Sequence, residues 1–180
     1  EPHEIKVGNI NPYLVEAGNF VMLKRRKPIC KVPEITFGNM PNDGGHLLLD
    51  NNEKDELLRT EPKAEKFIRP LLSAKEWING EKRWCLWLEK IKPAELRSMP
   101  AIQERVRKVR EHRLSSKRHA TQKLAEYPTL FGEIRQPENS YVLIPRVTLE
   151  NRKYVPIGMF SPEFIVADTC LAVPNAYLFH

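Results

Sequence analysis

The sequence predicts an α+β fold, in which a mixed and mostly antiparallel sheet is interrupted by a basic helical excursion over about residues 93–127. Short runs of β-branched and aromatic residues, separated by turn signals, occupy both ends of the chain and are typical of strands. The stretch between them instead repeats its apolar residues at helical spacing. Because 41% of the 180 residues are hydrophobic, the chain can bury a core, and we expect residues 1–180 to form one domain.

The N-terminal third is expected to hold strands joined by loops. β-branched and aromatic residues at 20–23 and at 34–37 favour extended structure. Between these runs lie the basic residues Lys24, Arg25 and Arg26, followed closely by a proline. Such a sequence is typical of an exposed basic loop.

A turn and a short helix are predicted next. Residues 42–45 are Asn, Asp and two Gly, which tolerate positive φ, and the apolar run 47–49 that follows them predicts a strand. Polar residues at 50–52 can cap a helix that starts near Glu53. Its buried side would carry Leu57 and Leu58.

The middle of the chain contains a hairpin signal. The dipeptide Asn79-Gly80 favours a tight turn that would pair residues 77–78 with residues 83–88. Tryptophan side chains on this hairpin would make it a centre of the core. The last third returns to strand signals, at residues 141–144, 154–157 and 164–167.

The basic excursion carries the electrostatic signal of the chain. The formal net charge is +6, and residues 103–123 account for all of it. Ile102, Val106 and Val109 lie at i, i+4 and i+7, which predicts a helix with one anchored apolar stripe and a solvated basic remainder. A concentrated positive surface is expected of a protein that meets phosphates. A solvated helix that binds nothing acidic is the alternative that charge alone leaves open.

A second candidate lies in the polar stretch 148–153. Glu150 and Arg152 are two residues apart, so that in an extended segment their side chains point the same way. A glutamate can accept a hydrogen bond from cytosine N4, and an arginine can donate to guanine O6 and N7. One face of this stretch could therefore read bases, although a surface ion pair between the two residues is the alternative.

Patterns that carry catalysis are missing from the sequence. It contains no complete Gly-rich cofactor loop, Asn/Asp-Pro-Pro-aromatic loop, HExxH, GxSxG or P-loop. On a continuous helix His112 and His119 would lie about 10 Å apart, too far for one zinc ion. The three cysteines have no ligand spacing, and we expect reduced core thiols. A small nuclease that uses one of these histidines and an RNA-binding protein remain open as other function classes.

Several blocks of the sequence closely resemble the target-recognition domain of MmeI-like DNA methyltransferases. They run across nearly the whole chain, and their combination is far more specific than any single motif. The blocks are FGNMPNDGG (37–45), GEKRWCLWL (80–88), ELRSMP (95–100), residues 117–124, FGEIRQP (131–137), IPR (144–146) and YVPIG (154–158).

In that family one polypeptide typically joins an endonuclease domain, a methyltransferase domain that uses S-adenosylmethionine, and a target-recognition domain. The resemblance implies that this chain is the third part of an adenine-N6 DNA methyltransferase, with no catalytic residue, metal ligand or cofactor of its own. Its expected partners are double-stranded DNA and the methyltransferase domain of the same polypeptide, with an endonuclease domain left open. No membrane is expected, because no apolar run could span one, and the expected location is the cytoplasm.

The resemblance also strengthens the assignment of DNA contacts. Residues expected to contact bases are Arg118, Glu150 and Arg152. Residues expected to contact the DNA backbone are Lys24, Arg25, Arg26, Arg105, Arg107, Lys108, Arg110, Lys117 and Arg146.

Overall fold

The computed structural model describes residues 4–25, 28, 30–148 and 150–176, and the chain divides into two units, Glu1–Val32 and Pro33–His180. In the first unit the strand expected at 20–23 is wrong: these residues are irregular, and Phe20 and Leu23 are 55% and 75% exposed. Nothing in the described part of this unit pairs with their backbone in a sheet. Apolar side chains alone do not make a strand without a neighbouring strand to bond to. Arg26 of the predicted basic loop lies outside the described residues.

The second unit contains two four-stranded sheets, which confirms the predicted α+β class. One sheet is antiparallel throughout and has the order β1 (Thr36–Phe37), β8 (Cys170–Pro174), β5 (Tyr141–Pro145) and β6 (Gly158–Phe160). The other has the order β2 (Leu48–Leu49), β4 (Trp84–Leu86), β3 (Ile68–Leu72) and β7 (Ile165–Val166), and only β3 and β7 run parallel. The strand expected at 154–157 is wrong, because β6 begins only at Gly158 and the residues before it are irregular.

Helix α1 (Asn51–Thr60) begins where its capping signal predicts. The Asp50 side chain accepts a hydrogen bond from the Glu53 backbone N–H at 2.8 Å, and the Glu53 carboxylate accepts one from the Asp50 N–H at 3.0 Å. This reciprocal pair satisfies two donors that the helix start leaves free. Leu57 is buried as expected, whereas Leu58 is half-buried. A 3-10 helix, η1 (Pro62–Phe67), connects α1 to β3.

The hairpin expected around residues 79 and 80 is wrong. Residues Ala74–Asn79 form helix α2 instead, which Ser73 and Glu76 cap at its start. Gly80 then ends the helix with φ of 69°, the left-handed conformation common at helix ends. A tight hairpin turn requires the same positive φ, so the Asn-Gly signal cannot by itself distinguish the two structures.

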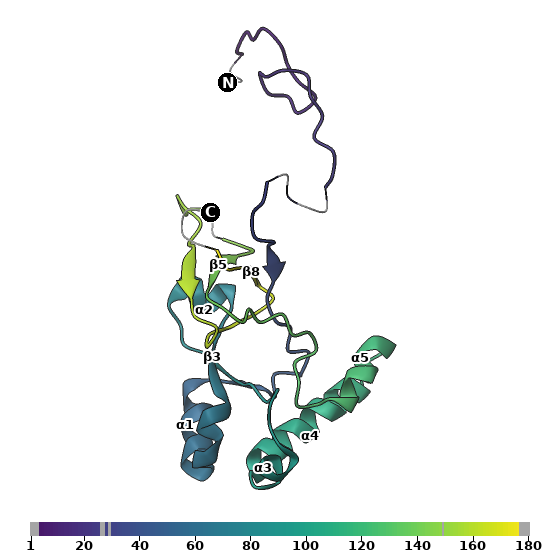
Figure 1. Ribbon diagram of the computed structural model, residues 1–180, viewed down its shortest axis with the longest axis vertical. Coiled ribbons are helices and arrows are strands. Elements are labelled where there is room, and N and C mark those ends of the chain that lie inside the picture. Colours follow the sequence, from purple (N-terminus) through teal and green to yellow (C-terminus); the bar gives the residue numbers. More distant parts are fainter. Residues whose placement is uncertain (1–3, 26–27, 29, 149, 177–180) are drawn as a thin grey trace. The chain divides into compact units, whose positions relative to one another are not determined.

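The basic excursion is helical as predicted. It consists of α3 (Pro93–Arg97), α4 (Pro100–Leu114), α5 (His119–Lys123) and the 3-10 turn η2 (Leu124–Glu126). Ile102, Val106 and Val109 are buried, which confirms the apolar stripe. Figure 1 shows α5 at the far end of α4, projecting away from the sheets.

Two apolar clusters form most of the core of the second unit. The larger joins the β2–β4–β3 strands to α4 through residues such as Leu49, Leu86 and Ile102. The smaller contains Tyr141 and Cys170, with Trp77 and Phe160 of neighbouring elements packed against it. Within the described ranges, no helix has the length and apolarity needed to cross a bilayer.

The cysteines only partly match their prediction. Cys85 and Cys170 are free thiols within the two core clusters, as expected. Cys30 is exposed, so the expectation of a core thiol is wrong there. It lies in the N-terminal unit, whose apolar side chains are largely exposed and provide no core to enclose it.

Candidate nucleic-acid interface

Arg105 is bound into the protein rather than presented to solvent. Its Nη1 donates to the carbonyl oxygens of His46 and Leu48 at 3.1 and 3.3 Å, and its Nη2 lies 2.9 Å from the Glu53 carboxylate. The side chain is 23% exposed. The backbone hydrogen bond from Asp50, and then Arg105, holds the pKa of Glu53 below its usual value. Arg105 therefore ties α4 to the start of α1.

Arg107 and Lys108 are exposed but engage acidic residues on their own helix. Arg107 pairs with Glu104 at 2.6 Å and with Glu111, while Lys108 Nζ lies 3.7 Å from Glu104. The hydrogen bond from Arg107 lowers the pKa of Glu104. The two glutamates thus balance Arg107 and Lys108 locally, and the net charge of residues 103–123 comes from the other basic residues of this stretch.

Arg113 is the largest departure from the expected solvated basic face. It is only 1% exposed, and all five of its N–H groups donate to backbone carbonyls. Burial lowers the pKa of its guanidinium, an effect that Asp43 opposes. The acceptors are the carbonyl oxygens of Pro41, Asn42, Leu124, Tyr127 and Leu130.

Three exposed cations lie close together in sequence at the far end of the excursion. Lys117 and Arg118 precede α5 and Lys123 ends it, and all three are exposed. We call these three residues the basic tip. Arg110 is also exposed on α4, and across the described part of the chain neither it nor the basic tip takes part in an ion pair. The sequence analysis did not name Lys123 as a DNA contact, although this residue ends the basic stretch 103–123.

His112 and His119 both lie exposed on the basic excursion. His112 is exposed on α4, and its ring lies so close to Gly44 that a Cβ added there would be 2.9 Å from it. His119 is exposed at the start of α5. No group of three or more His, Cys, Asp or Glu residues suited to a metal occurs among the residues that the structure describes.

The predicted base-reading pair lies in the connection from β5 to β6, residues 146–157, which we call the specificity loop after the role that the sequence predicts for it. Its described residues, 146–148 and 150–157, are irregular. Glu150 and Arg152 are both exposed, and in the described residues no ion pair joins them. Arg152 Nη2 donates to the Ile78 carbonyl at 3.0 Å, and Arg146 Nη1 donates to the Asp168 carbonyl at 2.9 Å. Each guanidinium thus fastens the loop through one nitrogen and retains other donors for a ligand.

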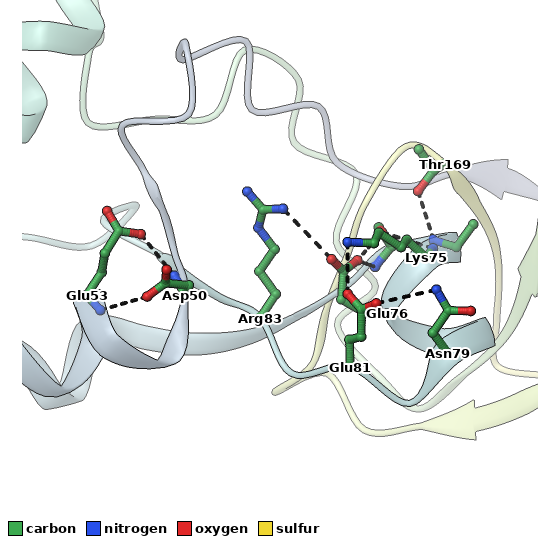
Figure 2. A network of polar contacts seen from close by, with 10 residues as sticks. Asp50, Glu53, Lys75, Glu76, Asn79, Glu81, Arg83 and Thr169 are labelled. Carbon is green, nitrogen blue, oxygen red and sulfur yellow. Dashed lines mark hydrogen bonds and ion pairs between the residues drawn. The ribbon is translucent and has the colours of Figure 1, made fainter.

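Helix α2 is the support of this loop, and polar contacts hold the helix in place (Figure 2). The Ala74 backbone N–H donates to the Thr169 hydroxyl at 3.0 Å, and Lys75 pairs with Glu81 at 3.0 Å. Figure 2 also shows Arg83 directed at Glu76, whose buried carboxylate lies 3.9 Å away. These contacts anchor the first half of α2, the helix whose Ile78 carbonyl the loop contacts.

The second unit presents the basic tip and the specificity loop as two separate groups. Figure 1 shows α5 on one side of this unit and the β5–β6 strands on another. Lys24 and Arg25 are exposed in the N-terminal unit. The predicted contacts thus fall into several groups of exposed residues, while Arg105 is mainly an internal tie.

Comparison with known proteins identifies the family. The chain is 35% identical over 173 residues to DNA methyltransferase A of Bacillus subtilis (strain 168), covering 96% of this chain and 20% of that protein. It also matches a solved structure described as the Type IIL restriction-modification enzyme MmeI in complex with DNA, with 39% identity and a TM-score of 0.87. That match covers 98% of this chain and 24% of the MmeI chain, so the sequence spans a fifth to a quarter of these relatives. Residues 16–180 match the family described as "MmeI, target recognition domain", and the chain belongs to this family.

Proposed function

We propose that this chain is the sequence-specific DNA recognition module of a larger S-adenosylmethionine-dependent adenine-N6 methyltransferase of a restriction-modification system. The observation that carries this proposal is the match over 98% of the chain to MmeI, which was solved with DNA. Residues 1–180 act as one recognition module in it, and the methyltransferase domain, together with an endonuclease domain in a parent enzyme that also cleaves DNA, belongs to other parts of the polypeptide. The cofactor binds outside this module, and the protein acts in the cytoplasm.

Base recognition is assigned to the specificity loop and to Arg118. Glu150 offers a carboxylate that can accept from cytosine N4, and Arg152 retains guanidinium donors for guanine O6 and N7. Both side chains are exposed on irregular backbone, where they can approach base edges in a major groove. Arg118 is exposed beside α5 and supplies a second guanidinium of the same chemistry.

Phosphate contacts are assigned to the exposed cations outside these three residues. Lys117, Lys123 and Arg110 are the strongest candidates, because they are exposed, carry no ion pair in the described residues and lie in the stretch 103–123 that holds the net positive charge. Arg146, Lys24 and Arg25 supply further contacts, as do Arg107 and Lys108 after exchange of their glutamate partners. Each lost phosphate contact reduces the slope of log K against log salt by about 0.9.

Site profiling of the full-length enzyme tests this proposal. Glu150→Ala, Arg152→Ala and Arg118→Ala are expected to change which sequences are methylated, since a lost base contact costs about 1 to 3 kcal/mol on the preferred site. Lys117→Ala is expected to weaken binding to all sequences alike and to reduce the salt slope. Arg59→Ala, an exposed cation on α1, is the control and should change neither quantity. Unchanged site preferences in all three base-contact variants would show that bases are read elsewhere.

A further inference from the structure

The specificity loop rests on α2 through one aromatic side chain, Trp77. The indole Nε1 donates a hydrogen bond to the Pro156 carbonyl at 2.9 Å, near the end of the loop. The ring itself packs edge-on against Phe160 of β6, with centroids 5.0 Å apart and an interplanar angle of 86°. Trp77 thus contacts both the loop and the strand into which the loop runs.

The fit between Trp77 and the chain is close at Gly158, the first residue of β6. A Cβ added at this position would lie 2.7 Å from Trp77 Cζ2, nearer than real Cβ contacts allow. The indole therefore lies directly against the backbone, and only glycine leaves room for it. Movement of the ring would shift the end of the specificity loop.

Trp77 is itself held on a fixed helix. The Ser73 and Glu76 cap at the start of α2, and Gly80 in the left-handed conformation at its end, define the limits of the helix. The loop also reaches the next residue of α2, because Arg152 donates to the Ile78 carbonyl. Two successive residues of one short helix therefore hold the loop, one by its own donor and one by its carbonyl.

We propose that Trp77 is a positioning residue for DNA sequence specificity: it holds the 146–157 loop in the conformation that presents its base-reading side chains. This inference rests on the proposed function of the loop. Recognition requires that the reading groups be held within about 0.5 Å of their productive positions by supporting residues. A tryptophan that spans loop, helix and strand supplies this support without touching a base.

The test is Trp77→Phe in the full-length enzyme, which keeps an aromatic ring against Phe160 and removes the donor to Pro156. We measure discrimination as the ratio of the methylation rate on the preferred duplex to the rate on duplexes with one changed base pair. We expect this ratio to fall about 5-fold, the factor that corresponds to the net free energy of one neutral hydrogen bond. The matched control is Trp87→Phe, because Trp87 packs edge-on against Phe131 at 5.1 Å in the other core cluster. It should leave discrimination unchanged even where it lowers the melting temperature.

Gly158→Ala provides a second route to the same displacement, because the new methyl group must push against the Trp77 ring. A reduced discrimination ratio in Trp77→Phe or in Gly158→Ala, without the same change in Trp87→Phe, supports the proposal. If Trp77→Phe and Gly158→Ala slow methylation equally on all duplexes, or leave the ratio unchanged, the proposal is overturned. A purely structural role lowers activity without altering sequence preference.

Glu150→Ala and Arg152→Ala in the same panel separate this inference from the proposed function. If these two variants change site preference while Trp77→Phe and Gly158→Ala do not, the positioning role alone is refuted. If the Trp77 and Gly158 variants change preference while the other two do not, Trp77 positions a loop that reads bases through other residues. That result supports the positioning role and refutes the assignment of the base readers.

Discussion

Replacement of Arg113 by methionine should destabilise the protein far more than any exposed arginine on the same helix. The substitution removes five hydrogen bonds of 2.7 to 3.1 Å and leaves the carbonyl acceptors around the side chain without these donors. A hydrogen bond to a charged group contributes about 1.5 to 3 kcal/mol net, but desolvation of the buried cation offsets part of the total. We therefore expect a net loss of about 3 to 5 kcal/mol, the equivalent of about two such hydrogen bonds, once the desolvation of the cation is subtracted.

The assay is urea denaturation monitored by circular dichroism, with Arg110→Met as the matched control. Arg110 is exposed three residues earlier on α4, and its substitution should change the free energy of unfolding by no more than about 0.5 kcal/mol. Arg113→Lys should fall between the two, because an ammonium group has only three donors and cannot replace all five hydrogen bonds of the guanidinium. A loss below about 1 kcal/mol in Arg113→Met, or equal losses at both arginine positions, would refute the reasoning.

Three further predictions follow from local geometry. Gly38→Ala should lower the free energy of unfolding by about 1 to 3 kcal/mol in the same assay, since its Cβ would lie 2.4 Å from the Ala167 carbonyl oxygen; no loss would contradict this contact. Alkylation of the native protein, counted by mass spectrometry, should modify Cys30 quickly and the two buried cysteines only after denaturation, and rapid modification of all three would be inconsistent with the fold. Because the pKa of Glu53 is lowered in the folded protein, its carboxylate adds stability that is fully present above the ordinary glutamate pKa of about 4.3 and is lost as the pH falls through the lowered value. Glu53→Gln should therefore have a lower free energy of unfolding than the parent at pH 7 and nearly the same one at low pH. A difference between variant and parent that does not depend on pH would argue against this linkage.

Local features of the sequence determined much of the secondary structure. The stripe of Ile102, Val106 and Val109 identified α4, because a helix buries residues at that spacing wherever it packs. The cap at Asp50 identified the start of α1 for a similarly local reason. The Asn-Gly signal at residues 79 and 80 failed, because a helix end and a hairpin share its positive φ and only the surrounding contacts select between them.

The sequence also indicated a polar, exposed stretch around Glu150 and Arg152, because charged residues without an apolar pattern stay at the surface. It could not show that Trp77 supports this stretch, since the hydrogen bond joins residues 79 positions apart. Only the tertiary structure decided the roles of the arginines on α4. Arg110 and Arg113 have the same side chain on one helix, yet one is exposed and the other is buried. The difference comes from backbone carbonyls that the fold brings to Arg113 from as far as 72 positions away.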